Sequence, residues 1–407
     1  MKHTETNLQA AIESQRVWAQ IDLDALIHNY QISRDYIHSY NPKTPVIAVI
    51  KANAYGHGAA PCARALYGCG CRHFAVASAE EGVFIRHALA DMEQGDAEIL
   101  ILGSTAPARA ALLHEHRLTQ SLYSKEYASA LHAEAKRADV MLDVHVNLDT
   151  GMHRLGFPAY TPELAAKTVS AIADLMDTCD AFCIKGLFTH LSDADSGNFC
   201  LVQWQRFCAV KQALASIDKC PAFCHVCNSP GCMHYPDFYL NGVRIGALLF
   251  GVAPMESAMQ APAPGCNLFP VEQIRPTMRL QTRVIHMHTV AAGEPVGYGA
   301  QCRADRDRTI ATLSVGYADG LLRAYAGTTV TLHTALGDFS VPIVGRICMD
   351  LCMIDVTDLP CLIGDVVTLF GNDLRSIAAL ADHAGTIAYE VPCLITARVP
   401  RIYFTSK

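Results

Sequence analysis

The sequence lacks any block of basic residues, and its charged side chains are sparse. Asp, Glu, Lys and Arg together make up 17% of the 407 residues, and the formal net charge is −7. A protein that binds nucleic acid needs clustered Lys and Arg to neutralise phosphates, so we expect no nucleic-acid partner. No apolar run reaches the roughly 18 residues that span a bilayer, so we expect no membrane partner either. Disorder is excluded because 51% of the residues are hydrophobic.

A secretory signal is missing as well. The first 16 residues, MKHTETNLQAAIESQR, are polar and contain no apolar core. We therefore expect a cytoplasmic protein whose 17 cysteines are thiols, because that compartment is reducing. Two groups of cysteines, at 69–71 and 220–227, invite a zinc interpretation, but a structural zinc site needs four converging ligands. We predict small buried thiols there and no metal site.

The length of the chain predicts two domains, because a single hydrophobic core seldom serves 407 residues. We place the first domain at 1–268 and the second at 269–407, because the hydrophobic pattern changes after the proline-rich Ala261–Gly265. The first part alternates apolar runs with amphipathic stretches of helix length, which predicts an α/β fold, an N-terminal (β/α)8 TIM-type barrel. Its expected strands lie near 45–50, 73–77, 98–102, 119–123, 141–147, 184–190, 222–227 and 239–244.

The second part changes to short β-type runs separated by turn residues, which predicts a mainly β C-terminal domain. Its expected strands lie at 279–290, 308–315, 328–333, 339–344 and 365–370, and one helix is expected near 374–383.

A lone lysine ends the first barrel strand, within the stretch AVIKANAYGHG at 48–58. Taken alone, Lys51 fits a surface lysine that caps a strand. In a (β/α)8 barrel, however, functional groups gather at the C-terminal ends of the strands, and several other expected strands also end in polar residues. These are Asp149 and Arg154 after the fifth strand, His190 at the sixth, Asn228 and Ser229 after the seventh, and Arg244 at the eighth.

An amine beside anion-binding groups suggests a carbonyl cofactor that also carries a phosphate. Pyridoxal 5′-phosphate has both, and its aldehyde can bond to the amine of Lys51. Ser229, Gly246 and Ala247 follow the last two strands, where barrels commonly bind phosphate. Ser229 alone would serve equally well as a helix cap.

A series of motifs, taken in order, resembles the alanine racemases, a family of fold-type III pyridoxal-phosphate enzymes. The similarity runs from RVWAQIDLDALIHNY at 16–30 to ARVPRIYF at 397–404. Between them lie AVIKANAYGHG, DTGMHRLGF, FTHLSDAD, CHVCNS, NGVRIGALLFG, PVGYGA, SVGYADG, RICMD and TIAYEVPC. The resemblance implies an isomerase that interconverts L-alanine and D-alanine for the cell wall. It also implies a homodimer with shared active sites.

The resemblance implies roles for individual residues. Lys51 would anchor the cofactor and act as one of two catalytic bases, and Tyr298 would be the second base, supplied by the partner subunit. Arg154 would contact the phenolic oxygen of the cofactor and the substrate, and Met349 would bind the substrate carboxylate through its backbone. The residues that would hold the phosphate are Tyr55, Ser229, Gly246, Ala247 and Tyr389. Ordinary half-buried packing is the alternative for the isolated tyrosines.

Arg244 would face the pyridine nitrogen of the cofactor, supported by His225, while His190 would help to orient the tyrosine base. A guanidinium only donates hydrogen bonds, so the ring nitrogen would stay unprotonated and be a weaker electron sink. The resemblance thus implies a site that would suppress side reactions such as transamination. A structural salt bridge is the alternative role for Arg244.

One position departs from the family pattern. Members often have a lysine two residues before the DTGM aspartate, which carbon dioxide converts to an anionic carbamate that orients the arginine. Here the residue is Asn147, which cannot carry a carbamate. We predict that its amide oxygen accepts a hydrogen bond from Arg154, or that a small anion such as chloride lies beside both. The departure leaves serine open as a second substrate.

Two alternative functions come from related proteins. A fold-type III decarboxylase of basic amino acids also joins a barrel to a β domain, but the GYGA tyrosine and the RICMD segment favour racemisation. A pyridoxal-phosphate-binding protein without turnover would lack a second domain, and residues 270–407 argue against it.

Overall fold

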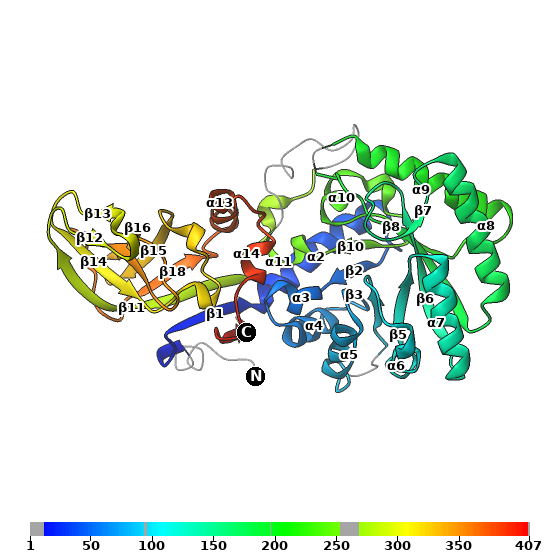
Figure 1. Cartoon of the computed structure of the whole chain (residues 1–407), viewed down its shortest axis with the longest axis horizontal. Coiled ribbons are helices and arrows are strands. Elements are labelled where there is room, and N and C mark those ends of the chain that lie inside the picture. Colours follow the sequence, from blue (N-terminus) through cyan, green and yellow to red (C-terminus); the bar gives the residue numbers. More distant parts are fainter. Residues whose placement is uncertain (1–11, 93–95, 196, 253–267, 406–407) are drawn as a thin grey trace.

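The computed structural model describes residues 12–92, 96–195, 197–252 and 268–405, and it has the fold class that the sequence predicts. A (β/α)8 barrel lies at one end of an elongated molecule and a β-rich part lies at the other (Figure 1). The proline-rich Ala261–Gly265 falls outside the described residues. The domain boundary at 268/269 stays a prediction.

Eight parallel strands form the barrel wall in the order β10-β2-β3-β4-β5-β6-β8-β9, and β7 (Phe157–Pro158) pairs with β6. Backbone hydrogen bonds from Asn241 and Arg244 to the carbonyls of Cys224 and Cys227 join the two ends of this series. Each strand corresponds to one of the runs expected from the sequence. They are β2 (Val46–Val49), β3 (His73–Val76), β4 (Glu98–Ile101), β5 (Leu118–Leu122), β6 (Leu142–Asp149), β8 (Phe182–Thr189), β9 (Phe223–His225) and β10 (Val243–Ile245).

Amphipathic helices cover the outside of the barrel (Figure 1). In α7 (Lys125–Arg137), for example, Tyr127, Leu131 and Ala135 are buried at helical spacing, and the Ser124 hydroxyl caps the helix by accepting a hydrogen bond from the Tyr127 amide. The other covering helices are α2 (Leu23–Tyr40), α4 (Ala59–Gly68), α5 (Ala79–Ala88), α6 (Ala110–Glu115), α8 (Pro162–Thr178) and α9 (Phe199–Ser216). Short helices follow three strands: α3 (Lys51–Tyr55), α10 (Ser229–His234) and α11 (Ala247–Phe250). None of the described helices has the length and hydropathy to cross a bilayer.

The second sheet includes a strand from the N-terminal end of the chain. Its order is β14-β17-β16-β15-β18-β11-β1-β19, and β1 pairs antiparallel with β11 and parallel with β19. Although β1 precedes the barrel in the chain, it thus belongs to the C-terminal sheet. The strands are β1 (Val17–Asp22), β11 (Met278–Val290), β14 (Arg308–Leu313), β15 (Thr329–Thr334), β16 (Gly337–Val344), β17 (Cys352–Asp355), β18 (Val366–Phe370) and β19 (Arg401–Phe404). A small separate pair is β12 (Pro295–Val296) with β13 (Cys302–Arg303).

Two helices of the C-terminal part lie between the sheet and the barrel, namely α13 (Leu374–Ala384) and α14 (Glu390–Cys393) (Figure 1). The start of α14 packs against α3 at the mouth of the barrel. The approach is close because a Cβ on Gly56, which has φ +81°, would lie 2.0 Å from the Pro392 carbonyl oxygen. This contact brings Tyr389 to the end of the barrel where strand β2 reaches Lys51.

Candidate active site

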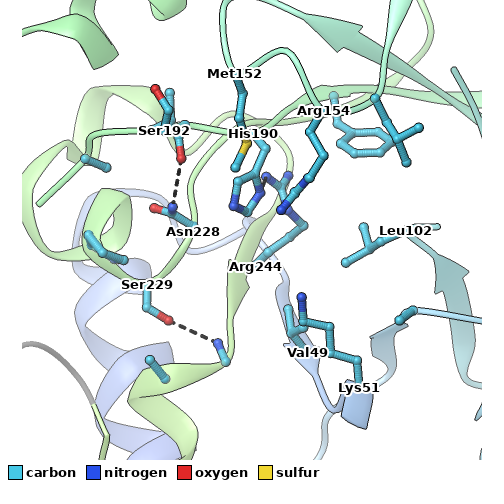
Figure 2. A pocket seen from close by; sticks show the side chains of 18 of the residues that line it. Val49, Lys51, Leu102, Met152, Arg154, His190, Ser192, Asn228, Ser229 and Arg244 are labelled. Atoms are coloured by element: carbon cyan, nitrogen blue, oxygen red, sulfur yellow. Dashed lines mark hydrogen bonds between the residues drawn. The ribbon is translucent and has the colours of Figure 1, made fainter. Parts of the chain in front are cut away.

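A cavity of about 710 Å³ opens at the C-terminal ends of the barrel strands. Strands β2, β6, β8, β9 and β10 all direct residues to it, and Figure 2 shows Lys51, Arg154, His190 and Arg244 converging from these separate strand ends. Nine of the residues predicted from the sequence line it. They are Lys51, Tyr55, Arg154, His190, Ser229, Arg244, Gly246, Ala247 and Tyr389.

Lys51 is followed by an unusual left-handed turn. Ala52, Asn53, Ala54 and Tyr55 all have φ between 52° and 56°, a conformation that costs a residue with a side chain about 1–2 kcal/mol. Side chains compensate for this strain: the Glu81 carboxylate accepts a hydrogen bond from the Ala52 amide at 2.7 Å, and the Asn53 amide oxygen accepts one from the Ala59 amide at 2.8 Å. The turn places both Lys51 and Tyr55 at the cavity wall.

Electrostatics favour a neutral amine at Lys51 and an anionic ligand beside it. Burial lowers the pKa of Lys51, and the positive charge of Arg154 lowers it further. Arg154 has no hydrogen bond or ion pair among the described residues, so its guanidinium is free to bind a ligand. Arg154 and Arg244 give the cavity wall two guanidinium groups, which suit a phosphate, a phenolate or a carboxylate, while Asp149 and Asp195 also line it.

A second part of the cavity has the features of a phosphate site. The Ser229 hydroxyl accepts a hydrogen bond from the backbone amide of Gly246 at 3.0 Å (Figure 2). It also accepts one from the Leu248 amide at 3.5 Å. Burial raises the pKa of Tyr55 to about 12, so its phenol stays protonated and can donate. A Cβ on Gly246 would lie 2.4 Å from the Tyr55 Oη, so only glycine leaves room for that hydroxyl.

Arg244 is 2% exposed and held by an extensive hydrogen-bond network. Its Nη1 donates to His225 Nδ1 at 2.5 Å and to the His225 carbonyl at 3.1 Å, while Nη2 donates to the carbonyls of Thr189 at 2.7 Å and Val226 at 2.9 Å. A fifth, longer contact joins Nη2 to His190 Nδ1 at 3.5 Å. These contacts involve both Nη groups, which leaves Nε–H as the donor available to a ligand. Burial lowers the pKa of Arg244 to about 10. The hydrogen-bond partners of Arg244 among the described residues are histidine nitrogens and backbone carbonyls, with no carboxylate among them, which removes the support for a structural salt bridge.

The structure contradicts one expected contact, the hydrogen bond from Arg154 to Asn147. Asn147 is 7% exposed, its Nδ2 donates to the Leu155 carbonyl at 3.1 Å, and its Oδ1 has no partner among the described residues. The side-chain amide of Asn147 is therefore hydrogen-bonded to the backbone of the loop that follows β6, and Arg154 makes no hydrogen bond to it. The alternative, a small anion beside both residues, stays a prediction.

Three predicted residues lie outside the cavity wall. His225 is fully buried behind Arg244. Tyr298 and Met349 belong to the C-terminal part of the chain, where they are 70% and 53% exposed, and neither lines the cavity of its own chain. If these two residues act at such a cavity, they must do so in a second copy of the chain.

Sequence reasoning missed Glu81 and Asn53, which hold the left-handed turn after Lys51. No sequence signal marks Glu81, because it belongs to the following β/α unit and reaches the turn only in the folded barrel. Asn53 belongs to the stretch AVIKANAYGHG. Asparagine tolerates positive φ better than most residues, and this could have indicated a left-handed turn there.

The pocket fits pyridoxal 5′-phosphate: it combines a lysine of lowered pKa, hydroxyl and amide groups placed for a phosphate, and a buried arginine with one donor to spare. Fold and site thus define a pyridoxal-phosphate enzyme built on a (β/α)8 barrel. Residues 21–254 match the family described as alanine racemase, N-terminal domain, and residues 277–403 match alanine racemase, C-terminal domain. The chain belongs to the alanine racemase family, which depends on pyridoxal 5′-phosphate.

Individual relatives agree over nearly the whole chain. An alanine racemase of Desulfovibrio desulfuricans is 36% identical over 390 residues, which cover 95% of this chain and 98% of the relative. An alanine racemase of Clostridium difficile 630 in complex with cycloserine has a TM-score of 0.82 at 30% identity and 97% coverage of both chains. The alanine racemase of Bacillus anthracis with bound L-Ala-P has a TM-score of 0.82 at 28% identity, covering 97% of this chain and 96% of that chain.

The close approach at Gly246 gives a direct test of the phosphate site. We expect Gly246→Ala to weaken pyridoxal-phosphate binding by at least about tenfold, because the new Cβ displaces the Tyr55 hydroxyl and a charge-assisted hydrogen bond contributes about 1.5–3 kcal/mol. Titration of cofactor-free protein by absorbance measures the affinity. Gly68→Ala is the matched control, because a Cβ there meets nothing within 4 Å. Equal affinities for the two variants would place the phosphate elsewhere.

Proposed function

We propose that the protein interconverts L-alanine and D-alanine by a two-base reaction in which Lys51 serves one face of the substrate and Tyr298 of a second subunit serves the other. The observation that carries the proposal is Lys51 itself, with its lowered pKa, at the end of β2 in a cavity that Arg154 and Arg244 also line. The bound ligand L-Ala-P in the Bacillus anthracis structure supports a small amino acid as the substrate.

Different residues of the cavity would bind different parts of the cofactor and the substrate. Ser229, Gly246, Ala247, Tyr55 and Tyr389 would hold the phosphate, since they surround one part of the cavity and burial raises the pKa of Tyr389, which keeps its phenol protonated. Bound pyridoxal phosphate supplies the electron sink that stabilises negative charge at the α-carbon of the substrate. Lys51, when neutral, can take a proton from that carbon or return one.

Arginine and histidine side chains orient the reactants. Arg244 would direct its free Nε–H to the pyridine nitrogen, and Arg154 would bind the phenolic oxygen and the substrate. Burial and the charge of Arg244 hold the pKa of His190 well below its ordinary value, so its imidazole is neutral and able to accept a hydrogen bond from Arg244 or the tyrosine base.

The second base requires a partner. Tyr298 and Met349 are exposed on the C-terminal part and outside the cavity of their own chain, which supports a homodimer in which each subunit completes the other's site. Met349 would present its backbone to the substrate carboxylate. We place the enzyme in the cytosol, where the described cysteines would stay the free thiols that the structure shows, and we propose D-alanine for the bacterial cell wall as its product.

Chiral chromatography of L-alanine and L-serine, each incubated with the purified holoenzyme, tests the proposal. We expect D-alanine to form faster than D-serine. If neither D-enantiomer forms although the cofactor is bound, the racemase proposal fails. Lysine and ornithine would then be assayed for decarboxylation.

Asn147 leads to a prediction about bicarbonate. We expect the racemisation rate to be the same with and without added bicarbonate at constant ionic strength, because an amide cannot form a carbamate. Asn147→Lys is the matched variant, and it should gain a response to bicarbonate. A bicarbonate requirement in the unaltered enzyme would contradict the prediction, and replacing chloride with a larger anion tests the remaining alternative of a bound chloride.

A further inference from the structure

A chain of three buried side chains leads from the cavity into the barrel interior. Arg244 on β10 donates to His225 Nδ1 on β9 at 2.5 Å, and His225 Nε2 lies 3.0 Å from Nδ1 of His145 on β6. His225 is fully buried and His145 is 6% exposed. The family comparison gave His225 a role beside Arg244, but nothing in the sequence motifs gave one to His145.

The chemistry of the three groups fixes the direction of every hydrogen bond. A guanidinium has no acceptor, so His225 Nδ1 must be unprotonated. Burial, together with the charge of Arg244, holds the pKa of His225 well below its ordinary value, and burial lowers the pKa of His145 to about 4, so both rings are neutral with one proton each. The proton of His225 is therefore on Nε2, and it can only be donated to His145 Nδ1. His145 then carries its own proton on Nε2.

The barrel wall is built to hold the His145 ring. The pairing of β6 with β8 slips by one residue between Val144 and His145, which brings Gly186 opposite the histidine. A Cβ on Gly186 would lie 2.5 Å from the ring carbon Cγ of His145, so glycine is needed beneath the ring. The ring also packs on Phe223, with centroids 5.7 Å apart. It also borders a cavity of about 10 Å³ that Glu98, Thr119 and Phe223 line as well.

We propose that His145 is a positioning residue for the racemase reaction: by accepting from His225 Nε2 it fixes the tautomer that lets His225 Nδ1 accept from Arg244. The other tautomer of His225 would point an N–H at the guanidinium. Arg244 Nη1 would keep only the His225 carbonyl as an acceptor, and we expect the guanidinium to shift from the position in which Nη2 reaches its two carbonyl partners and Nε–H is left for a ligand. The inference rests on the proposed role of Arg244 at the pyridine nitrogen.

The first test needs no variant and no substrate. Long-range ¹H–¹⁵N correlation spectra of the protein labelled at histidine nitrogen report which ring nitrogen carries the proton. We expect the Nε2–H form for both His225 and His145 at neutral pH, with His225→Gln and His145→Asn used to assign the signals. A His225 signal of the Nδ1–H form would overturn the proposal, whatever reaction the enzyme catalyses.

The second test separates positioning from simple packing. In His145→Asn the amide oxygen takes the place of Nδ1 and still accepts, whereas in His145→Leu no acceptor remains. We expect kcat of His145→Leu to fall about tenfold, while KM for alanine stays within about twofold. The tenfold figure is the lower end of the range seen at metal sites when the hydrogen-bond partner of a metal-binding histidine is removed. His145→Asn should retain most of the activity.

His73→Leu is the matched control, because His73 also stacks on Phe223, at 5.8 Å, but makes no hydrogen bond to His225. We expect its kcat to be unchanged. Equal losses in His145→Leu and His145→Asn, or an unchanged kcat in both, would overturn the proposal. Absence of racemisation in the unaltered enzyme would instead refute the proposed function, while the NMR result would still decide the tautomer.

Discussion

Lys51→Ala is expected to lose both the covalent attachment of pyridoxal phosphate and the racemisation of alanine. Lys51 is the only lysine that lines the described cavity, and its burial beside Arg154 favours the neutral, nucleophilic amine. General acid–base groups contribute roughly 10²–10⁴-fold to a rate, so the loss of an anchor that is also a base should reduce kcat by about 10³-fold or more.

Borohydride reduction of the holoenzyme, followed by peptide mass spectrometry, would show which lysine carries the cofactor. Reduction fixes the cofactor permanently to the lysine that holds it. We expect the attached cofactor on the peptide that contains Lys51, and none in Lys51→Ala. Lys125→Ala serves as the control, because Lys125 is an exposed surface lysine that lies 3.6 Å from the Asp174 carboxylate. A label on another lysine, or a Lys51→Ala variant with nearly normal kcat, would refute the assignment.

The position of Lys51 could be predicted from sequence because the signal is local. A run of buried apolar residues ends at one charged residue, and the repeated alternation of such runs with amphipathic stretches identifies the strands of a barrel. All functional residues at the strand ends then share one rim by topology alone. The eight barrel strands were predicted within a few residues for the same reason, because each one is a short apolar run with turn signals on both sides.

The details that the sequence did not predict depend on contacts between distant parts of the chain. Strand β1 pairs with β11 and β19, which are separated from it by the entire barrel, so its own residues could not show which sheet it would join. The side chain of Asn147 donates to the Leu155 carbonyl because of how the loop after β6 folds. The sequence NLDTGMHRL does not indicate this hydrogen bond.

The histidines of the barrel interior show a third limit. The alternation in LDVHVNLD indicates that His145 lies on a strand, but a buried histidine in a strand is compatible with many partners. Only the register slip opposite Gly186 and the hydrogen bond to His225 show which partner the His145 ring has. A sequence can therefore locate groups that act at strand ends more readily than the groups behind them.

Tyr298→Phe is expected to abolish racemisation while leaving one half of the reaction intact. The variant lacks only the hydroxyl that would serve one face of the substrate, and Lys51 remains on the other. In deuterated water, one enantiomer of alanine should therefore still exchange its α-hydrogen, whereas the other should not, and kcat for interconversion should fall by roughly 10²–10⁴-fold. NMR of each enantiomer over time measures both rates. Exchange of both enantiomers at the normal rate would refute a two-base reaction.

Mixing the two inactive variants tests whether the active site is shared between subunits. Tyr298 is 70% exposed and absent from the cavity that contains Lys51 of the same chain, so a complete site needs Lys51 from one subunit and Tyr298 from the other. Co-expressed Lys51→Ala and Tyr298→Phe chains should form mixed dimers in which one of the two sites has both residues. With random pairing, half of the dimers are mixed, and the preparation should show about a quarter of the normal activity. If the site were built within one chain, each subunit of the mixture would still lack one base and no activity would return.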